Sequence, residues 1–484
     1  MKKLTDILKN TPVREVCGDT AAAIGGLVYD SRAVKPGDCF FAVPGTQSDG
    51  HDYIPIAVEK GAAAIVCERM PADAAEGVAY VLVGDSAGAM ADMAAAFYDY
   101  PSRELKLVGI TGTNGKTTTA TLLYDLVRAM GYKAGLISTV VYKIDGREVE
   151  ATHTTPDSIR LNAMMREMAD AGCAYCFMEC SSHAIVQERT RGLDFAGGIF
   201  SNITHDHLDY HKTFAEYIRA KKLFFDGLPK GAFALTNADD RNGRVMVQNT
   251  AAAVSAYSLR AMADFRCKIV EMHLDGMLLR IDGQELWVGL LGRFNAYNLL
   301  AVYGAAVLLG LDRGEVLRVL SMLHAVSGRF EKIRAANGTT AIVDYAHTPD
   351  ALENVIQTIE EIRTPGQQLI VVCGCGGDRD RTKRPEMAQI AVKYASTAIF
   401  TSDNPRHESP EAILDDMVAG LEPGARYLRI ADRAEAIRTA VMLSRPGDII
   451  LVAGKGHETY QIVGDVKHPF DDREEIKKRF ALLN

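Results

Sequence analysis

The chain has 484 residues, with 54 lysines and arginines against 62 aspartates and glutamates, so its formal net charge is −8. Soluble domains run to about 100–200 residues, so this length predicts two to four domains with full-sized cores. Its 48% hydrophobic and 24% charged residues are typical of a globular protein and exclude a disordered or fibrous chain. The mild acidity disfavours nucleic-acid binding, which needs a clustered basic face. It leaves room for a few local cations around a phosphorylated ligand.

The apolar segments and the cysteines predict a cytoplasmic protein. The N-terminal segment MKKLTDILKN has no apolar stretch behind its lysines, so we expect no signal peptide. The longest uncharged apolar stretch, residues 299–311, is shorter than the roughly 20 residues that a membrane-spanning helix needs. Nine cysteines, an odd number, fit free thiols better than a disulfide framework. Cys173 and Cys176 form a CxxC with Cys180 close behind, but the apolar segment CAYCFMEC around them favours core packing over a metal site.

The apolar runs predict a series of strands and helices in chain order. Residues 1–100 mix short apolar runs with helical patches, and Pro101 marks a boundary because proline disfavours helix at the preceding residue. Residues 105–111 predict a buried strand, followed by a glycine-rich loop and an amphipathic helix over residues 117–131. Further strands are expected within residues 176–180, 196–204 and 231–237, and then within 339–347, 367–377, 396–405 and 448–456.

This order of elements predicts an α/β protein with three domains, over residues 1–100, 101–327 and 328–484. We expect the central domain to contain a P-loop-type parallel sheet and the C-terminal domain to be Rossmann-like. Each apolar run ends in polar, glycine-bearing residues, and in open α/β sheets such strand ends carry the ligand sites.

The strongest motif is the glycine-rich segment GITGTNGKTT, residues 109–118. Such a turn directs backbone N–H groups at phosphate oxygens, and the following helix N-terminus adds its partial positive charge. Lys116 would reach the outer phosphates and the Thr117 hydroxyl would contact Mg²⁺. The pattern GxxxxGK[ST] would require a glycine at position 110, where Ile110 stands. A glycine-rich turn without a ligand is the alternative, but the strand before it and the helix after it favour a nucleotide.

The segment GTNGKTT after an apolar strand resembles the Mur ligase superfamily, the ATP-dependent amide-forming ligases of peptidoglycan and folylpolyglutamate synthesis. Other segments agree with that family in its own order over almost the whole chain. These are ECSSH at 179–183, HDHLDYH at 205–211, NADD at 237–240, GRFNAYN at 292–298, GRFE at 328–331 and DYAH at 344–347. The resemblance implies an acid–amino-acid ligase in which residues 1–100 bind a uridine-diphosphate substrate, the central domain binds ATP and the C-terminal domain binds an amino acid.

The resemblance also implies residue roles around ATP and Mg²⁺. Glu179, at a strand end, and His207 would be metal ligands beside Thr117, and Lys116, Glu179 and His207 would be catalytic. The residues expected to bind ATP are Gly112, Thr113, Asn114, Gly115, Lys116, Thr117, Thr118, Asn295, Asn298, Arg329 and Asp344. Taken alone, the histidines of residues 205–211 could hold a transition metal, and Asn295 and Asn298, on one helix face, could be cap residues. The nearby phosphate loop favours the oxygen-rich surroundings of Mg²⁺.

Lys221 lies in an amphipathic segment, residues 214–225, which reads as a helix. By itself the pair Lys221-Lys222 is typical of a solvated basic patch. The family pattern YxxxKxxLF, however, aligns Lys221 with a lysine that reacts with CO₂. The resulting carbamate would supply anionic oxygens to a second Mg²⁺, which an ammonium group cannot do. We therefore expect Lys221 to be a carbamylated metal ligand and a catalytic residue.

Two further segments resemble one branch of the family, whose members add the third residue to UDP-N-acetylmuramoyl-L-alanyl-D-glutamate. One is the N-terminal DSRAVKPGDCF followed by GTQS, although DSR before a PG turn is also common in surface loops. The other is TTPD at residues 154–157. The residues expected to contact the UDP-muramoyl-dipeptide are Ser31, Thr46, Gln47, Thr154, Thr155, Ser181, Gln187 and Arg189. Arginines such as Arg189 pair with carboxylates or phosphates bidentately.

The segment DNPR, residues 403–406, resembles the specificity segment of the ligases that add meso-2,6-diaminopimelate. As a bare pattern it is also a reasonable turn with a solvated arginine. A guanidinium fits the far carboxylate of that amino acid in two parallel hydrogen bonds, and it would repel the bare amine of lysine. The residues expected to bind diaminopimelate are Arg379, Asp403, Asn404, Pro405, Arg406, Gly454 and Glu458.

The implied reaction passes the γ-phosphate of ATP to a carboxylate and then lets an amine attack the acyl phosphate. The alternatives are a ligase that adds L-lysine and a folylpolyglutamate synthase, whose relatives lack the DSR and DNPR segments. A P-loop GTPase would need an NKxD-like segment, which we do not find, and a kinase would release a phosphorylated product. We expect a monomer that binds no nucleic acid and spans no membrane.

Overall fold

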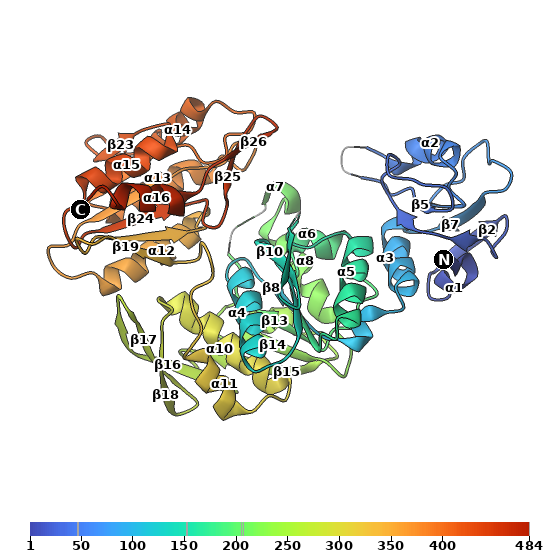
Figure 1. Ribbon diagram of the computed structural model, residues 1–484, viewed down its shortest axis with the longest axis horizontal. Helices are drawn as coiled ribbons and strands as arrows, with labels where there is room; N and C mark the ends of the chain where they lie inside the picture. Colours follow the sequence, from blue (N-terminus) through green and yellow to red (C-terminus); the bar gives the residue numbers. More distant parts are fainter. Residues whose placement is uncertain (46–47, 152, 205, 207, 484) are drawn as a thin grey trace.

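The computed structural model describes residues 1–484 except 46, 47, 152, 205, 207 and 484. The chain forms three large sheets that follow one another along the sequence, with helices packed on them, which confirms the predicted α/β class. The region with the central sheet lies between the other two, and the N-terminal and C-terminal regions lie on opposite sides of it (Figure 1). In the described part of the chain, no helix is both long and apolar enough to cross a membrane.

The N-terminal region contains a five-stranded sheet of order β2-β7-β6-β5-β4 and a two-stranded pair, β1 and β3. Its strands are β1 (Lys2–Lys3), β2 (Val13–Cys17), β3 (Ala23–Ile24), β4 (Leu27–Val28), β5 (Cys39–Phe41), β6 (Ala64–Cys67) and β7 (Ala79–Val83). Its helices are α1 (Leu4–Ile7), η1 (Gly50–Tyr53), α2 (Ile54–Glu59), α3 (Ser86–Phe97) and η2 (Pro101–Glu104). Helix α3 leads toward the central region (Figure 1).

The central region is built on an eleven-stranded sheet of order β11-β10-β9-β12-β8-β13-β14-β15-β16-β17-β18. Its strands are β8 (Lys106–Thr111), β9 (Ala134–Ile137), β10 (Val141–Ile144), β11 (Arg147–Glu150), β12 (Tyr175–Glu179), β13 (Gly197–Phe200), β14 (Phe233–Asn237), β15 (Ala253–Ser258), β16 (Phe265–His273), β17 (Gly276–Ile281) and β18 (Gln284–Val288). Its helices are α4 (Lys116–Ala129), α5 (Ser158–Asp170), α6 (Ser182–Val186), α7 (Leu208–His211), α8 (Phe214–Asp226), α9 (Gly243–Met246), α10 (Arg293–Leu308) and α11 (Arg313–Leu320).

Both faces of the parallel centre of this sheet are buried, as expected for parallel strands covered by helices. Side chains alternate between the two faces along a strand, so Leu107 and Val108 of β8 join different hydrophobic clusters. One cluster contains residues of α4 and α10, and the other contains residues of α5 and α8. The parallel centre of the sheet therefore aligns the ends of β8, β12 and β13, where the sequence placed the ligand residues.

Two antiparallel extensions of the central sheet were not among the sequence predictions. Strands β10 and β11 pair at one edge, and β16, β17 and β18 pair at the other. An Asp-Gly turn joins each hairpin β10–β11 and β17–β18, with positive φ at Asp145 (47°), Gly146 (89°), Asp282 (47°) and Gly283 (86°). Asp-Gly is a strong hairpin signal because both central residues of a type I′ turn need φ > 0. The signal was present in the sequence and was not used.

The C-terminal region contains a six-stranded sheet of order β19-β20-β24-β21-β22-β23, antiparallel only at β19, and a separate hairpin, β25–β26. Its strands are β19 (Glu331–Arg334), β20 (Thr340–Asp344), β21 (Leu369–Cys373), β22 (Thr397–Phe400), β23 (Tyr427–Arg429), β24 (Ile449–Ala453), β25 (Tyr460–Val463) and β26 (Val466–Pro469). Its helices are α12 (Pro349–Ile362), α13 (Lys383–Tyr394), α14 (Pro410–Val418), α15 (Arg433–Leu443) and α16 (Asp472–Phe480).

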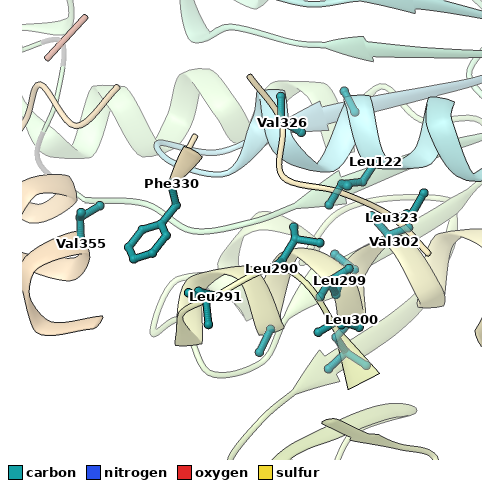
Figure 2. Close-up of a cluster of buried hydrophobic side chains, with 14 of the residues drawn as sticks. Leu122, Leu290, Leu291, Leu299, Leu300, Val302, Leu323, Val326, Phe330 and Val355 are labelled. Atoms are coloured by element: carbon teal, nitrogen blue, oxygen red, sulfur yellow. The ribbon is translucent and has the colours of Figure 1, made fainter. Parts of the chain in front are cut away.

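An apolar junction joins the central and C-terminal regions. Leu290 and Leu291, before α10, belong to the same buried cluster as Phe330 of the connecting segment and Val355 of α12 (Figure 2). The rings of Phe294 and Phe330 lie 5.9 Å apart. One continuous core therefore spans both regions, and it sets the position of the C-terminal sheet against the phosphate loop.

All nine cysteines lie within the described residues and carry free thiols. Cys173, Cys176 and Cys180 belong to the hydrophobic cluster beside α5 and α8. Burial raises the pKa of the Cys173 thiol and of its two neighbours. These three are core side chains, as the sequence favoured.

A buried ion pair ties the last helix to the C-terminal sheet. Arg433, at the start of α15, and Asp472, at the start of α16, both have fully buried side chains. Two hydrogen bonds join them, Nε to Oδ1 at 2.7 Å and Nη2 to Oδ2 at 2.8 Å, and Nη2 also donates to the Ala453 carbonyl at 3.0 Å. Removing either charge would leave the other buried without a partner.

We therefore expect Asp472→Asn to lower the free energy of unfolding by ~3–5 kcal/mol, the usual effect of breaking a buried pair. Urea denaturation of the full chain measures it. The control is Arg438→Ala on α15, the helix that carries Arg433. Arg438 forms an exposed pair with Glu435, and such pairs contribute little to stability. Equal stability of the two variants would contradict a structural role for the buried pair.

Candidate active site

The phosphate loop connects β8 to α4 and is braced by neighbouring elements. Gly115, the residue before α4, has φ of +87°, and a Cβ there would lie 2.5 Å from Oδ1 of Asn298 on α10. The Thr113 and Asn114 backbone N–H groups donate to Asn202, which follows β13, at 2.8 and 3.0 Å. The loop is thus pre-shaped by glycine, which tolerates this conformation, and by hydrogen bonds from an adjacent strand end.

Two lysines converge on this loop. The Lys116 Nζ donates to the carbonyls of Gly112 and Thr113 at 2.9 and 2.8 Å, and the Lys221 Nζ donates to the same Gly112 carbonyl at 2.8 Å. A lysine at a loop–helix junction is expected to be exposed, but the Lys116 side chain folds back over the loop and is half-buried. Lys221 is only 1% exposed, so the alternative of a solvated patch is wrong as well. The neighbouring Lys222 is less buried than Lys221 and forms an ion pair with Asp226.

Burial and mutual repulsion perturb both ammonium groups. Burial lowers the pKa of Lys116, against the opposing attraction of Glu179 and Asp206. Burial, followed by the charge of Lys116, lowers the pKa of Lys221 well below its usual range. Lys221 therefore carries a neutral amine more readily than an ordinary lysine, and a neutral amine is a nucleophile.

Glu179 ends β12 and lies beside the loop with a nearly fully buried carboxylate. Its Oε1 accepts hydrogen bonds from the Thr139 backbone N–H at 2.7 Å and from the Thr139 hydroxyl at 3.1 Å. Its backbone carbonyl accepts from the Thr155 hydroxyl at 2.7 Å, and the Thr139 hydroxyl also reaches Thr154 at 3.1 Å. Glu179 thus links the phosphate loop to the threonines predicted to contact the muramoyl-dipeptide.

Arg329 and Asp344 approach the loop from the C-terminal side. The Arg329 Nη2 donates to the Thr117 hydroxyl at 3.2 Å, and its guanidinium lies 4.5 Å from the centre of the Tyr345 ring. The Asp344 Oδ2 accepts from the Phe330 backbone N–H at 2.7 Å. Burial raises the pKa of Asp344 to about 6, although the Arg329 charge opposes that rise.

A cavity of about 470 Å³ opens over this loop. The predicted site residues that line it are Thr113, Asn114, Gly115, Lys116, Thr117, Thr118, Thr154, Glu179, Ser181, Lys221, Asn298, Arg329 and Asp344. Asn295 lies behind the wall, where its amide donates to the Leu291 carbonyl at 2.7 Å and accepts from Asn298 at 3.2 Å. Neither asparagine caps α10, whose N-cap is Gly292.

The far end of this cavity contains residues that the sequence reasoning missed. It is lined by Asn237 and Asp239 at the end of β14 and by Arg260 and Tyr297. Asp239 accepts from the Ser258 hydroxyl at 2.6 Å and from the Tyr297 hydroxyl at 2.8 Å. The segment NADD pointed to this place, but only the fold brings it next to α10.

The residues predicted for the muramoyl-dipeptide are brought together in part. Arg189 donates to the Thr155 carbonyl at 2.6 Å and to the Gln187 side chain at 2.7 Å, and Ser181 caps α6 beside them. Ser31 lies apart, buried in the N-terminal region, and lines neither of the cavities described here. Thr46, Gln47 and His207 lie outside the described residues.

A larger cavity, of about 970 Å³, lies in the C-terminal region. Of the residues predicted to bind diaminopimelate, it is lined by Arg379, Asp403, Asn404, Arg406, Gly454 and Glu458. Pro405 is buried behind the turn. Thr154, Asp206, Tyr345, His347 and Asp350 line both cavities, so the two spaces adjoin at these residues. Asp350 lies next to the phosphate loop, since it accepts a hydrogen bond from the Asn114 side chain at 2.9 Å.

Arg406 is held in an unusual backbone conformation at this cavity. Its φ is +51°, a left-handed conformation that non-glycine residues rarely adopt. Its backbone N–H donates to the Ile462 carbonyl at 3.1 Å, and its guanidinium Nη1 donates to the Gly377 carbonyl at 2.8 Å. Burial, and then the nearby charge of Arg379, lowers the pKa of Arg406, so the pocket favours an added anion.

A second arginine, missed by the sequence reasoning, organises the same loops. The fully buried Arg384 forms two hydrogen bonds to the Glu408 carboxylate, at 2.8 and 3.0 Å, and one to Asp416 at 2.7 Å. Glu408 in turn accepts from the Asp378 backbone N–H at 2.6 Å. The hydrogen bond from Arg384 lowers the pKa of Glu408 to about 2. This pair joins the loop that carries Arg379 to the turn that carries Arg406.

The residues beside the phosphate loop fit a hard cation on one condition. Mg²⁺ takes oxygen ligands, and the Thr117 hydroxyl and Glu179 carboxylate line the same cavity. An unmodified Lys221 offers no oxygen. If its amine carried CO₂, the carbamate would add anionic oxygens next to Glu179, so the donor set fits Mg²⁺ with that modification in place.

Comparison with known proteins agrees with this geometry. Residues 23–98 match the Mur ligase family catalytic domain, residues 110–306 the Mur ligase middle domain, and residues 328–456 the Mur ligase glutamate ligase domain. The chain is 56% identical over 481 residues to the UDP-N-acetylmuramoyl-L-alanyl-D-glutamate--2,6-diaminopimelate ligase of Phocaeicola vulgatus, with 99% of each chain covered.

Solved structures are similar as well. A UDP-N-acetylmuramoyl-L-alanyl-D-glutamate--2,6-diaminopimelate ligase superposes with a TM-score of 0.71 at 32% identity, covering 100% of this chain and 99% of the other. A MurF ligase of Thermotoga maritima, solved in complex with ADP, gives a TM-score of 0.64 at 19% identity, with coverages of 94% and 96%. The second likeness is one of fold alone.

The raised pKa of Asp344 generates a prediction about nucleotide binding. At pH 7.5 the carboxylate is charged and can accept hydrogen bonds from a ligand, whereas below pH 6 it becomes protonated. We expect the Kd of ADP, measured by calorimetry, to rise up to about tenfold for each pH unit below 6. Asp344→Asn is the control, because residue 344 then cannot be protonated and the remaining pH dependence comes from the ADP phosphate itself. A pH dependence identical in the two proteins would exclude Asp344 from nucleotide binding.

Proposed function

The chain belongs to the Mur ligase family, and from this premise we propose that it adds meso-2,6-diaminopimelate to UDP-N-acetylmuramoyl-L-alanyl-D-glutamate at the expense of ATP. This is a step of peptidoglycan synthesis. The observation that carries the proposal is that two cavities adjoin at residues beside the phosphate loop, such as Asp350 and Tyr345. One cavity contains the phosphate loop, and the other ends at Arg406, Asn404 and Glu458. An acyl donor activated in the first would face an amine delivered from the second.

The first step transfers the γ-phosphoryl group of ATP to the side-chain carboxylate of the D-glutamyl residue. The bond to the β–γ bridging oxygen breaks, a bond to a carboxylate oxygen forms, and ADP leaves. The Lys116 ammonium and the Arg329 guanidinium are placed beside the loop to stabilise the phosphate charge. Preorganised charges of this kind are most effective where water is excluded.

The second step joins the amine to the activated carboxyl carbon. The amine of diaminopimelate attacks the acyl phosphate, the tetrahedral intermediate expels inorganic phosphate, and the nitrogen loses a proton to give the amide. Arg406 receives the carboxylate at the far end of the amino acid in a bidentate pair. Glu458 receives an ammonium group of the same substrate. Both side chains orient the amine by holding the amino acid at its distal parts.

Bound Mg²⁺ supplies charge neutralisation for the phosphates. We assign Thr117, Glu179 and His207 as ligands of Mg²⁺, and Lys221 in the carbamylated form as a ligand of a second Mg²⁺. Lys221 suits that modification because a buried amine with a lowered pKa is available to attack CO₂. Carbamylation replaces a positive charge beside Lys116 with a negative one, so it also relieves the repulsion between the two lysines.

Particular observations disfavour the two alternative functions, folylpolyglutamate synthesis and the addition of L-lysine. A folylpolyglutamate synthase-like function does not account for the DSR and DNPR segments, and the relative that covers 99% of this chain carries a diaminopimelate ligase name. An L-lysine-adding enzyme would leave the half-buried Arg406 without a carboxylate. Three further predictions stay as proposals. The protein is a monomer, its domain boundaries lie at residues 100 and 327, and Ser31, Thr46 and Gln47 contact the UDP-muramoyl-dipeptide.

The test of the proposal is a phosphate-release assay with ATP, the UDP-muramoyl-dipeptide and a panel of diamino acids. We expect phosphate and amide product only when both the dipeptide and diaminopimelate are present. Substantial turnover without the dipeptide, or release of a phosphorylated product without an amino acid, would refute the ligase assignment.

For Lys221 we expect native mass spectrometry of the intact protein at high bicarbonate to show a mass increase of one CO₂, which Lys221→Ala should lack. Lys221→Ala should lose nearly all turnover because the anionic oxygens are gone, while ADP still binds to the intact loop. Lys222→Ala, at the neighbouring and more exposed position, is the matched control and should keep full activity. Normal turnover by Lys221→Ala would refute the carbamate.

For Arg406 we expect kcat/KM with diaminopimelate to exceed that with L-lysine by a wide margin in the wild type. Arg406→Ala should lower kcat/KM for diaminopimelate by a factor equivalent to ~2–5 kcal/mol of transition-state stabilisation, the usual effect of removing one partner of a charged pair that is held away from water. The loss with lysine should be much smaller, since lysine lacks the second carboxylate. Equal use of the two amino acids by the wild type would overturn this specificity and leave the ligase reaction standing.

A further inference from the structure

A buried lysine, to which the proposed reaction gives no role, lies behind the residues that line the amino-acid end of the larger cavity. Lys455 follows β24 in the segment AGKGHE, and its side chain is completely buried. Its Nζ donates to the Asn404 Oδ1 at 3.1 Å and to the Glu458 Oε2 at 2.9 Å, and it lies 5.7 Å from the centre of the Tyr460 ring. A buried ammonium group must be paired and hydrogen-bonded to be tolerated, and these partners satisfy it.

These contacts determine which polar atoms are left for a ligand. The Asn404 Oδ1 accepts from Lys455 and from the Ile462 backbone N–H at 2.9 Å, so the amide nitrogen must face the other way. It donates to the Glu458 Oε2 at 2.8 Å. That oxygen therefore receives two hydrogen bonds, one from Asn404 and one from Lys455. Within the described part of the chain, the other oxygen, Oε1, has only a long contact of 3.5 Å with the Tyr345 hydroxyl.

We propose that Lys455 is a positioning residue for the amino-acid substrate. Its ammonium group fixes the Asn404 amide and the Glu458 carboxylate so that the Glu458 Oε1 points to an ammonium group of the diamino acid. Lys455 itself does not touch the substrate. The inference rests on the proposed function of this cavity, and it adds a residue that acts entirely through two others.

The arrangement has a consequence that a general packing role lacks. Without the ammonium group, the Asn404 Oδ1 keeps only one of its two donors, the Ile462 backbone N–H, so the amide is held less firmly. Glu458 loses one of the two donors that hold its Oε2, and its carboxylate can rotate away from the substrate. Both changes weaken binding of the amino acid, and neither reaches the phosphate loop.

The first test is steady-state kinetics of full-length Lys455→Met. We expect KM for meso-diaminopimelate to rise about 30-fold, the smaller end of the effect of unpairing a buried charge, with KM for ATP and for the UDP-muramoyl-dipeptide unchanged. The control is Lys467→Met. Lys467 is exposed on the adjacent hairpin, 4.4 Å from the same Tyr460 ring, and its removal should leave all three KM values unchanged.

The second test is a double-mutant cycle with Glu458→Gln. If Lys455 acts through Glu458 and Asn404, Lys455→Met should raise KM for diaminopimelate much less in the Glu458→Gln background than in the wild type, because only the Asn404 part of its effect remains. Additive effects of the two substitutions, or a wild-type KM in Lys455→Met, would overturn the proposal. If Lys455→Met melts well below the wild type, Lys455→Gln replaces it, with the same expected rise in KM and the same cycle. Absence of any diaminopimelate-dependent product from the wild type would instead refute the proposed function.

Discussion

Two lysines, the half-buried Lys116 and the fully buried Lys221, donate to one carbonyl oxygen, that of Gly112, and the proposed nucleotide site depends on this convergence. Lys116 comes from the loop itself and Lys221 from α8, more than 100 residues later, at 2.9 and 2.8 Å from the shared oxygen. Two like charges this close repel each other. Burial and this repulsion together lower the pKa of Lys221 well below that of an ordinary lysine. The fold thus places Lys116 beside the proposed phosphate site and prepares Lys221 to lose its charge.

The same loop connects the central region to the C-terminal region. The Asn114 side chain donates to Asp350, at the start of α12, at 2.9 Å, and the Thr117 hydroxyl accepts from Arg329. Arg329 stacks on Tyr345, whose hydroxyl lies 3.5 Å from Glu458. A short series of contacts therefore runs from the phosphate loop to the amino-acid pocket. The apolar junction around Phe330 holds these polar contacts in register (Figure 2).

Local apolar runs in the sequence predicted the fold class and most strands at the centre of the parallel sheets, but not β9, β15 or β23. Most of the predicted residues that line the two cavities came instead from the resemblance to the Mur ligase family. An apolar run that ends in glycine and polar residues marks both a buried strand and a ligand position. The antiparallel extension β16–β18 was missed because its exposed faces break the apolar runs, although Asp282-Gly283 marked its turn. Long-range pairs were also missed. Arg384 reaches Glu408 across 24 residues and Lys455 reaches Asn404 across 51, and no local pattern encodes such contacts.

The exposure of single side chains was the weakest part of the sequence reasoning. A lysine at a loop–helix junction is usually solvated, yet Lys116 folds back over its own loop, and Lys221 is buried although its neighbour Lys222 is not. In each case the deciding contact is a backbone carbonyl, whose position only the folded chain determines. Motifs therefore located these lysines near the phosphate loop but did not predict their environments.

The charges around Arg406 explain why these environments matter for the proposed specificity. Arg379, Asp403 and Glu458 line the same cavity as Arg406, and Lys455 is buried behind it, where it pairs with Glu458. Burial and then the charge of Arg379 lower the pKa of Arg406, so an anion placed beside that guanidinium is favoured. An amino acid whose far end carries a carboxylate supplies such an anion, whereas one that ends in a bare ammonium group would place a like charge there.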